Sequence, residues 1–301
     1  LLASSAASDV YKRQDGELRD PFKKLTTVFQ MSEEMFFLHY GKDGCNRHVL
    51  IDECRELFGE IYEQIPELPF CNIWTAMQLS SRLPKGALFH MGVSNTRRCW
   101  NMFQLPESVE SACNVGCCGI DGCVSTLVGA SLVNPDRLCY VVVGDLTFFY
   151  DLNSLGNHHI GTNLRVMLVN NGRGTEFRLG IHHCNVFGDD ADKYMAAAGH
   201  FGNKSPLLVK HYAEDLGFHY LSATTKEEFM TALSNFTNPQ LSDHSMILEV
   251  FTDSKDESEA LYLMSHIQSD AKGMVRSKLK DAVRNVAGEK GINAIKKILK
   301  K

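Results

Sequence analysis

The stretch of residues 141–174 constrains the fold most, because it contains two strongly apolar runs separated by a helical pattern. The runs cover residues 140–143 and 164–169, and their apolar residues are continuous rather than alternating. Continuous runs are typical of strands covered on both faces, as in a parallel sheet. Between them, apolar residues recur at helical spacing, at Phe148, Phe149, Leu152 and Leu155. The stretch therefore predicts a strand, helix, strand crossover.

Polar residues follow both apolar runs. Gly144 and Asp145 come after the first run, and Asn170 and Asn171 come after the second. Open α/β sheets bind their ligands at the carboxyl ends of their strands. Mg²⁺ prefers oxygen ligands, typically carboxylates and phosphates. We therefore expect Asp145, one Asn side chain and a carbonyl after Asn171 to hold Mg²⁺, with Thr147 and helix N-terminal amides holding a diphosphate.

The same residues carry a resemblance to a known family. A GD pair followed about twenty-five residues later by NN resembles the signature of thiamine diphosphate enzymes. The segments GDLTFFYDLNSL, SACNVGCCGIDGCVSTLVGASL and NNGRGTEF are most similar to the 2-succinyl-5-enolpyruvyl-6-hydroxy-3-cyclohexene-1-carboxylate synthases of menaquinone biosynthesis. The resemblance implies the diphosphate-binding domain of such an enzyme, a three-layer α/β/α sandwich with a mainly parallel sheet. The alternative is a generic crossover whose Asp and Asn side chains cap strand ends.

The resemblance implies thiamine diphosphate and Mg²⁺ as cofactors and assigns residues to them. Ile120 would hold the thiamine in its bent shape, whereas the alternative is a buried Ile at a helix start. The metal ligands would be Asp145, Asn171 and the carbonyl of Arg173. The residues implied to bind the cofactor are Ser94, Gly119, Ile120, Gly144, Asp145, Leu146, Thr147, Asn171 and Thr175.

Three residues are implied to lie on the substrate side, namely Arg98, Glu176 and Phe177. Arg98 matches a family arginine that binds a substrate carboxylate, although adjacent Arg97 and Arg98 also fit two surface charges. The chain departs from the family where Val115 replaces a second substrate-binding arginine and where Glu176 replaces an apolar residue. Val cannot replace the bidentate fork of Arg. Both departures indicate a different acceptor, and Glu176 is either a proton-transfer group or a solvated loop carboxylate.

The resemblance also implies a reaction and partners. Family enzymes decarboxylate a 2-oxo acid and transfer the product to an acceptor, and these substrates are 2-oxoglutarate and isochorismate for a true family synthase. A glutamate on a separate pyrimidine-binding domain, usually contributed across a dimer interface, activates the cofactor in the family. The chain contains no candidate segment for that domain. We expect the domain in the same full-length chain or on a separate subunit, in a homodimer or tetramer.

Two functions of different class stay open at this point. In the first, the chain is the C-terminal part of a carboligase or decarboxylase, that is, a transferase or lyase. In the second, it is a non-catalytic subunit that holds thiamine diphosphate for a partner. Among enzymes, a paralogous 2-oxo-acid decarboxylase or carboligase, for example of polysaccharide synthesis, competes with the menaquinone synthase.

Composition and charge argue against other classes. The chain has 301 residues, 44% of them hydrophobic, and a net charge of -5, which argues against a nucleic-acid binder. No apolar run approaches the ~20 residues that a transmembrane helix needs. The ten cysteines follow no metal-site pattern, and without a secretory signal we expect reduced thiols in a cytoplasmic protein. A metal site at His182, His183 and Cys184 is less favoured than a solvated loop.

The sequence divides into four parts. Residues 1–14 resemble translated adapter sequence, which indicates a non-native leader on a chain truncated at its N-terminus. Residues 15–84 are expected to form the end of a middle domain and a linker, and residues 85–270 the thiamine diphosphate-binding domain. Residues 271–301 form an amphipathic tail with a net charge of +8. A packed terminal helix is favoured there over a membrane or partner helix.

Periodicity predicts the other elements of the main domain. Strands are expected at residues 87–91, 218–221 and 246–252. Helices are expected at residues 121–133, 191–199, 206–216 and 226–236, after two earlier helices around residues 50–65 and 73–83. We expect Ser94 or Asn95 to cap the helix after the first strand, and Asp121 to cap the helix that follows it.

Overall fold

The computed structural model describes residues 27, 29, 31–41, 49–116, 118–179, 182–194 and 204–267. It divides the chain into two compact units, Leu1–Tyr62 and Glu63–Lys301. The predicted leader (1–14) and the predicted basic tail (271–301) lie outside the described residues. The domain limits expected at residues 84 and 270 stay predictions, although residues 63–84 fall in the second unit.

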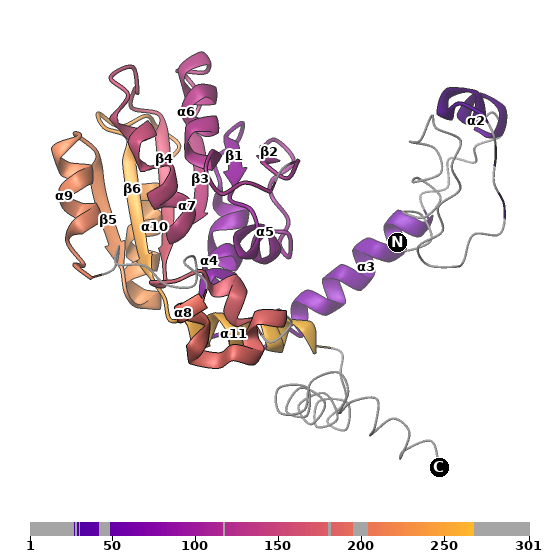
Figure 1. The fold of residues 1–301 in the computed structure, drawn as a ribbon. Helices are drawn as coiled ribbons and strands as arrows, with labels where there is room; N and C mark the ends of the chain where they lie inside the picture. The colour runs from indigo at the N-terminus through magenta and orange to yellow at the C-terminus, as the bar shows by residue number, and fades with distance from the viewer. Residues whose placement is uncertain are drawn as a thin grey trace, which may run out of the picture. The chain divides into compact units, whose positions relative to one another are not determined.

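The first unit contains two described helices (Figure 1). Helix α2, Glu33–Tyr40, begins after Ser32, whose hydroxyl accepts a hydrogen bond from the backbone N of Met35 at 3.3 Å. Helix α3, Val49–Glu63, ends at the start of the second unit. The helix predicted around residues 50–65 is therefore confirmed. Large apolar side chains are exposed on both helices, among them Phe37, Leu38, Leu50, Ile51 and Phe58.

The second unit is built on a six-stranded parallel sheet with the strand order β2-β1-β3-β4-β6-β5 (Figure 1). The strands are β1 (Leu88–Met91), β2 (Glu110–Cys113), β3 (Cys139–Gly144), β4 (Leu164–Asn170), β5 (His219–Ala223) and β6 (Met246–Phe251). Strands β3 and β4 pair from Cys139 opposite Leu164 to Gly144 opposite Val169. The residues that follow these two strands therefore leave the same edge of the sheet.

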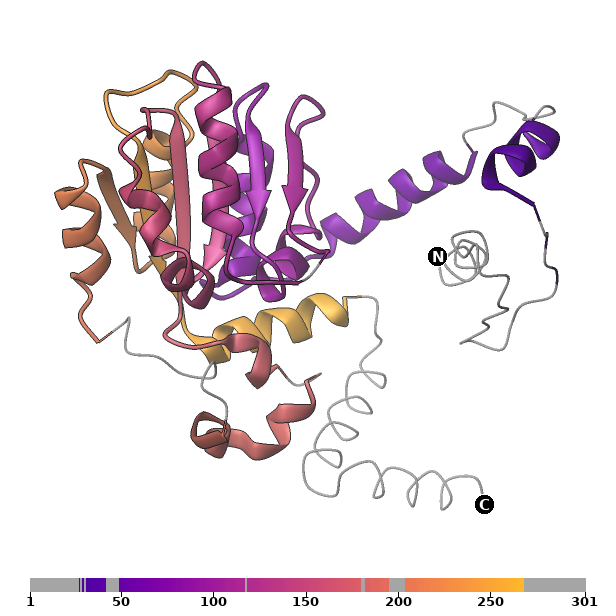
Figure 2. The ribbon, with the colours of Figure 1, turned by 45° about the horizontal axis from the view of Figure 1, so that its top comes forward.

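Helices cover both faces of this sheet (Figure 2). Helices α6 (Cys123–Val133), α7 (Asp145–Tyr150) and α9 (Leu208–Asp215) bury apolar residues against one face. The other face packs against α4 (Asn72–Leu79), α5 (Asn95–Trp100), α10 (Lys226–Phe236) and α11 (Ser254–Ser265). The short elements are η1 (Ser80–Arg82), η2 (Leu152–Gly156), η3 (Thr175–Arg178), η4 (His183–Asp190) and α8 (Ala191–Tyr194). The predicted three-layer α/β/α architecture is confirmed. Within the described ranges, no helix combines the length and apolar character that a membrane crossing requires.

The two-sided core explains why the apolar runs are continuous. In β3, Tyr140 and Val142 belong to the core cluster on one face, and Val141 and Val143 belong to the cluster on the other. All four side chains are fully buried. The Tyr140 hydroxyl donates to the carbonyl of Phe236 at 3.0 Å, so its polar atom is satisfied. A strand with both faces buried needs apolar residues at odd and even positions alike.

The crossover between β3 and β4 corrects one prediction. The helix expected across the whole connection ends at Tyr150, and the 3₁₀ segment η2 completes the crossover. The Asp151 carboxylate between them accepts hydrogen bonds from the backbone N of Ser125 at 2.7 Å and from its hydroxyl at 3.0 Å. Asp151 therefore links the crossover to the first turn of α6.

Two predicted helix caps are wrong. Ser94 precedes α5, but its side chain makes no capping hydrogen bond, and its backbone φ is 60°. Helix α6 starts at Cys123 rather than Asp121, and Gly122 stands at the cap position without a side-chain bond. Asp151 supplies the cap of α6 instead, from a remote segment. Local sequence identifies residues able to cap a helix, but the backbone path decides whether they do.

The sequence patterns miss helix α2 in the first unit and two elements of the second unit, β2 and α11. Strand β2 lies at the sheet edge and has mostly exposed residues, so it shows no apolar run. Helix α11 buries only three of its residues, Glu257, Ala260 and Leu261, and one of these is charged. The other predicted strands and helices are present with boundaries shifted by a few residues, and residues 195–199 of the helix expected at 191–199 lie outside the described residues.

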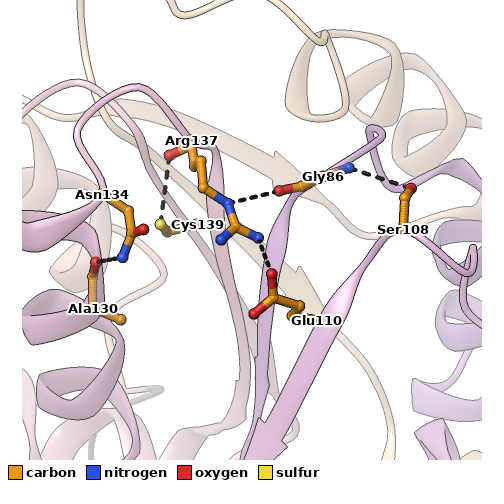
Figure 3. A network of polar contacts seen from close by, with 7 residues as sticks. All are labelled: Gly86, Ser108, Glu110, Ala130, Asn134, Arg137 and Cys139. Atoms are coloured by element: carbon orange, nitrogen blue, oxygen red, sulfur yellow. Dashed lines mark hydrogen bonds and ion pairs between the residues drawn. The ribbon is translucent and has the colours of Figure 1, made fainter.

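Arg137 ties the amino ends of three strands together (Figure 3). Its Nε donates to the carbonyl of Gly86 before β1 at 2.9 Å, and its guanidinium pairs with Glu110 at the start of β2, also at 2.9 Å. The backbone N of Gly86 donates to the Ser108 hydroxyl at 3.3 Å. Glu110 is largely exposed, so the ion pair itself adds little stability. The network mainly fixes the edge strand β2 against β1 and β3.

The Leu168→Ala variant tests the two-sided core. Leu168 in β4 is fully buried, and its replacement leaves a cavity that should lower the free energy of unfolding by about 2 to 5 kcal/mol. The control is Leu132→Ala in α6, where the side chain is 38% exposed, and its cost should stay within about 0.5 kcal/mol. Urea unfolding followed by circular dichroism measures both values. Equal costs for the two variants would contradict burial of Leu168 in the core on its face of the sheet.

Candidate functional site

A cavity of about 150 Å³ lies at the carboxyl edge of the sheet, within the second unit. Its walls come from the turn after β1, the loop before α6, the turn after β3, the loop after β4 and the start of α4. The lining residues are Asn72, Val93, Ser94, Asn95, Thr96, Ile120, Gly144, Asp145, Leu146, Thr147, Val169, Asn171, Arg173, Gly174, Thr175, Glu176 and Phe177. Segments distant in sequence thus meet where an open parallel sheet binds its ligands.

The cavity brings most of the predicted site residues together. Its lining includes Ser94, Ile120, Gly144, Asp145, Leu146, Thr147, Asn171, Arg173, Thr175, Glu176 and Phe177. Two predicted residues are outside the lining: Gly119 immediately precedes Ile120, and Arg98 contacts Glu176. The roles assigned to these residues in binding stay predictions, because their arrangement alone identifies no ligand.

Asp145 is the acidic group on the turn after β3. Its side chain is only 3% exposed, and its Oδ1 accepts a hydrogen bond from the backbone N of Leu146 at 2.8 Å. Thr147, two residues later, is also buried and lines the same cavity. A carboxylate with little access to water is costly to keep charged unless cations or hydrogen-bond donors lie close to it. The Asp145 carboxylate and the Thr147 hydroxyl thus lie on the same cavity wall.

A buried polar network holds the loop after β4. The side-chain amide of Asn170 donates to Glu249 on β6 at 2.7 Å, and the Tyr220 hydroxyl on β5 donates to the other Glu249 oxygen at 2.7 Å. Burial raises the pKa of Glu249, although both hydrogen bonds oppose that rise. The Asn170 side-chain oxygen accepts from the backbone N of Gly172 at 3.3 Å. Asn170 thus anchors the loop and leaves Asn171 to face the cavity.

The loop then turns sharply along the cavity wall. Gly172 has a φ of 79°, a conformation that favours glycine. The side-chain oxygen of Asn171 accepts a hydrogen bond from the backbone N of Arg173 at 3.3 Å, which is a long bond. An amide oxygen has a second lone pair. Asn171 therefore keeps the capacity to contact a ligand from this position.

Thr175 provides an unsatisfied polar atom on the cavity lining. Its side chain is 4% exposed, and its hydroxyl has no hydrogen-bond partner within the described structure. Leaving a buried hydroxyl unpaired costs about 1 to 3 kcal/mol. Since Thr175 lines the cavity, a bound group with an acceptor oxygen would satisfy it.

The turn after β1 approaches the sheet closely. The backbone N of Gly92 donates to the carbonyl of Val142 at 2.7 Å, and a Cβ on Gly92 would lie 3.3 Å from that oxygen. Ser94, two residues on, has a φ of 60° and lines the cavity. A non-glycine residue with positive φ is strained, and such strain concentrates at functional sites. The strain at Ser94 fits a residue placed for a ligand rather than for a helix cap.

The loop before α6 carries Ile120 to the cavity. The Asn114 side chain fastens this loop, because its amide donates to the carbonyl of Gly122 and to the hydroxyl of Thr126, each at 3.1 Å. A Cβ on Gly119 would lie 2.5 Å from the Asp121 carboxylate, so a larger residue there would displace that side chain. Ile120, rather than Gly119, is the residue of this loop on the cavity lining.

Arg98 and Glu176 form a bidentate ion pair beside the cavity. The two terminal guanidinium nitrogens of Arg98 donate to the two Glu176 oxygens at 2.8 and 3.0 Å. One of these nitrogens also donates to the Asn95 side-chain oxygen at 3.4 Å. The hydrogen bonds that Arg98 donates to Glu176 raise the pKa of Arg98, although partial burial opposes this rise. Arg98 is thus neither a free surface charge nor an open anion site, and Glu176 is not simply a solvated carboxylate.

Of the two remaining positions expected near the substrate, Phe177 lies on the cavity lining and Val115 does not. Phe177 lines the cavity, and its ring meets the His182 ring edge-on with centroids 5.3 Å apart. Val115 is 43% exposed and is not on the cavity lining. The position at which the family resemblance implies a second arginine therefore carries no group that could bind an anion here.

Sequence patterns did not point to Asn72, which lines the cavity, or to Glu257, which is hydrogen-bonded to it. Asn72, from α4, lines the cavity, and its backbone N donates to Glu257 on α11 at 3.0 Å. Its side-chain oxygen accepts from the Trp100 indole at 3.1 Å. The Thr252 hydroxyl donates to the same Glu257 oxygen at 2.8 Å. No motif connects Asn72 with the GD or NN segments, so no sequence signal marked it.

Glu257 is fully buried, and this shifts its titration. Burial raises the pKa of Glu257 to about 7, while the hydrogen bonds from Thr252 and Asn72 act in the opposite direction. The negative charges of Asp145 and Asp256 raise it further. One Glu257 oxygen has no hydrogen-bond partner in the described structure. The protonation of this group is thus linked to the charge at the cavity wall.

The cysteines and histidines within the described ranges outline no second site. The eight cysteines in the described residues are free, and burial raises the pKa of Cys71 to about 12. The His182 Nδ1 accepts a hydrogen bond from the backbone N of Cys184 at 3.1 Å. Among the residues that the structure describes, no group of three or more His, Cys, Asp or Glu side chains could hold a metal.

The Glu257→Gln variant tests the buried carboxyl group. The pKa of about 7 in the fold lies above the ordinary value of 4.5, so its favourable contribution is complete below about pH 4.5 and is lost as the pH rises through 7. Between pH 5 and pH 8 the wild type should lose up to about 3 kcal/mol more unfolding free energy than the variant. Urea titrations at both pH values measure this, with exposed Glu259→Gln on the same helix as control. Identical pH dependence of wild type and Glu257→Gln would contradict the shifted titration.

Comparison with curated proteins finds several relatives that share one name. The chain is 32% identical over 253 residues to the 2-succinyl-5-enolpyruvyl-6-hydroxy-3-cyclohexene-1-carboxylate synthase of Bacteroides fragilis, covering 82% of this chain and 43% of that protein. The synthases of the same name from Phocaeicola vulgatus and Christiangramia forsetii are 31% identical over 255 residues and 33% identical over 199 residues. These two alignments cover 82% and 66% of this chain and 42% and 33% of the relatives. No family model matches the chain. The chain spans less than half the length of these relatives, and over that length it is their homologue.

Proposed function

We propose that this chain binds thiamine diphosphate with Mg²⁺ and forms the diphosphate-binding part of a carboligase that acts on a 2-oxo acid. The observation that carries the proposal is the cavity itself. Its lining includes a buried carboxylate, Asp145, together with the Asn171 amide and the unpaired Thr175 hydroxyl. Homology to synthases that make a succinyl-substituted cyclohexene carboxylate, as their name states, supports the enzyme class.

The donor set fits a small hard cation. Asp145 would supply a carboxylate oxygen, Asn171 an amide oxygen and Arg173 a backbone carbonyl, and all three residues lie on one cavity. Mg²⁺ takes one or two carboxylates and completes its shell with phosphate oxygens and water. The set is incomplete by itself, which suits a metal that arrives with a diphosphate.

The rest of the lining fits the cofactor's two ends. Thr147, Thr175 and Ser94 offer hydroxyl groups to diphosphate oxygens, and Gly144 and Leu146 offer backbone atoms. Ile120 would support the thiamine from the loop before α6. When bound, thiamine diphosphate supplies the carbon nucleophile and electron sink for decarboxylating a 2-oxo acid. The protein side chains would bind, orient and shield the reacting groups.

The substrate pair is a finer part of the proposal. For a true family synthase it is 2-oxoglutarate with isochorismate. A paralogous 2-oxo-acid carboligase or decarboxylase is the second candidate, because Val115 faces solvent outside the cavity and Glu176 already pairs with Arg98. Either enzyme would take a pyrimidine-binding domain with an activating glutamate from the full-length protein or from a partner subunit, in a homodimer or tetramer. A non-catalytic subunit that holds the cofactor would need the same cavity but no residues that bind a substrate.

Removal of the Asp145 carboxylate tests the metal site. Asp145→Ala should abolish Mg²⁺-dependent binding of thiamine diphosphate, because the cavity loses its anionic metal ligand. Isothermal titration calorimetry of the 301-residue chain with thiamine diphosphate, with and without Mg²⁺, measures the effect. Exposed Asp215→Ala is the control and should bind like the wild type. Unchanged metal-dependent binding by Asp145→Ala would sink the assignment.

The Thr175→Val variant tests the unpaired hydroxyl. If that hydroxyl meets a diphosphate oxygen, its removal should weaken thiamine diphosphate binding about tenfold, the worth of one hydrogen bond to a charged group. The free protein loses no hydrogen bond, so its unfolding free energy should stay equal or rise by up to about 1 kcal/mol. Exposed Thr231→Val on α10 is the control. A stability loss without any change in binding would mean that Thr175 has a purely structural role.

A further inference from the structure

We propose that Glu176 is a specificity-determining residue that fills the guanidinium fork of Arg98 with the chain's own carboxylate. The substrate group that faces Arg98 would then be uncharged, such as a methyl, hydroxyl or carbonyl group, rather than a carboxylate. This inference rests on the proposed function, since it concerns the substrate side of the same cavity. It departs from the carboxylate-binding role that the family resemblance implies for Arg98.

The first support is that the fork is satisfied within the chain. Both terminal nitrogens of Arg98 donate to Glu176, at 2.8 and 3.0 Å, in the two-point geometry that a ligand carboxylate would otherwise adopt. Asn95, on the cavity lining, accepts a further bond from the same guanidinium. The side chains of Arg98 and Glu176 are 32% and 24% exposed, so the pair is partly shielded from water.

The second support is the charge around the cavity. Asp145 and Glu176 are acidic lining residues, and Arg173 is the basic one among the described residues. A ligand carboxylate that displaced Glu176 from Arg98 would leave that carboxylate unpaired on a wall that already holds Asp145. A partly buried carboxylate that loses its partner is costly. An uncharged group avoids this exchange.

The alternative explanation is that the ion pair only stabilises the fold, because it connects α5 with η3 across 78 positions of sequence. The two explanations differ in what they predict for ligands. A purely stabilising ion pair would affect stability alone, whereas a specificity residue would change which end groups the cavity accepts. Two 2-oxo acids of equal chain length separate them: 2-oxoglutarate ends in a second carboxylate, and 2-oxopentanoate ends in a methyl group.

The experiment compares the affinities of these two acids by calorimetry, with thiamine diphosphate and Mg²⁺ present. The wild type should bind 2-oxopentanoate at least as tightly as 2-oxoglutarate. Glu176→Gln keeps the side-chain shape but frees the charge of Arg98, and it should raise the preference for 2-oxoglutarate by about tenfold or more. The double variant Arg98→Gln with Glu176→Gln should lose that gain, which excludes Arg173 as its source.

A labelling measurement reads the ion pair without any cofactor. Phenylglyoxal modifies accessible guanidinium groups, and mass spectrometry separates Arg98 from its exposed neighbour Arg97. Arg98 should react more slowly than Arg97 in the wild type and at a similar rate in Glu176→Gln. Equal rates in the wild type would overturn the proposal, because the fork would then be open in solution.

The outcomes also separate this proposal from the proposed function. If the wild type does not bind thiamine diphosphate, the proposed function is wrong. The labelling experiment would still test whether Arg98 and Glu176 form the ion pair. Intact cofactor binding with no gain for 2-oxoglutarate in Glu176→Gln would overturn the specificity role. A wild type that already prefers 2-oxoglutarate about tenfold would overturn it as well. Thermal unfolding of each variant confirms that it is folded.

Discussion

Burial of a parallel sheet on both faces is the constraint on which the rest of the structure depends. Apolar side chains at odd and even positions of β3 and β4 occupy both cores, so polar groups are left to the strand ends. Because the strands are parallel, those ends lie on one edge, where Gly144 stands opposite Val169 and Gly92 bonds to Val142. The cavity is the result of this convergence, and the Arg137 network stabilises the opposite edge.

Buried polar side chains then fix the loops that a parallel sheet leaves without apolar support. Asp151 holds the first turn of α6, Glu249 holds Asn170 after β4, and Glu257 holds Asn72 at the start of α4. Each carboxylate comes from an element other than the one it fixes. Burying a carboxylate is costly, and hydrogen bonds compensate only part of that cost, as the raised pKa values of Glu249 and Glu257 indicate. Part of the stability of the sheet is thus given up to fix the loops around the cavity.

Much of the fold could be predicted from sequence, because its central strands carry continuous apolar runs and its turns carry the GD and NN pairs. The cavity lining was predictable to the extent that parallel strands deliver their following residues to one edge. Elements with weak apolar patterns, such as β2 and α11, could not be predicted. Backbone detail was also inaccessible: residue type marks Ser94 as a cap, but its positive φ turns it to the cavity instead. The partners of Arg98 and Asn72 depend on chain segments far away, and no local pattern encodes such pairs.

The bond between Asn72 and Glu257 has a consequence for the order of folding. The two residues are 185 positions apart. The cavity wall at Asn72 can therefore gain this bond only after all six strands have been synthesised. Contacts of such sequence separation carry a high loop-closure cost and form late. During synthesis, the sheet edge with Asp145 and Asn171 would exist before α11 emerges. Because Ala260 and Leu261 of α11 also belong to one of the two cores, that core and the cavity would be completed at the same stage.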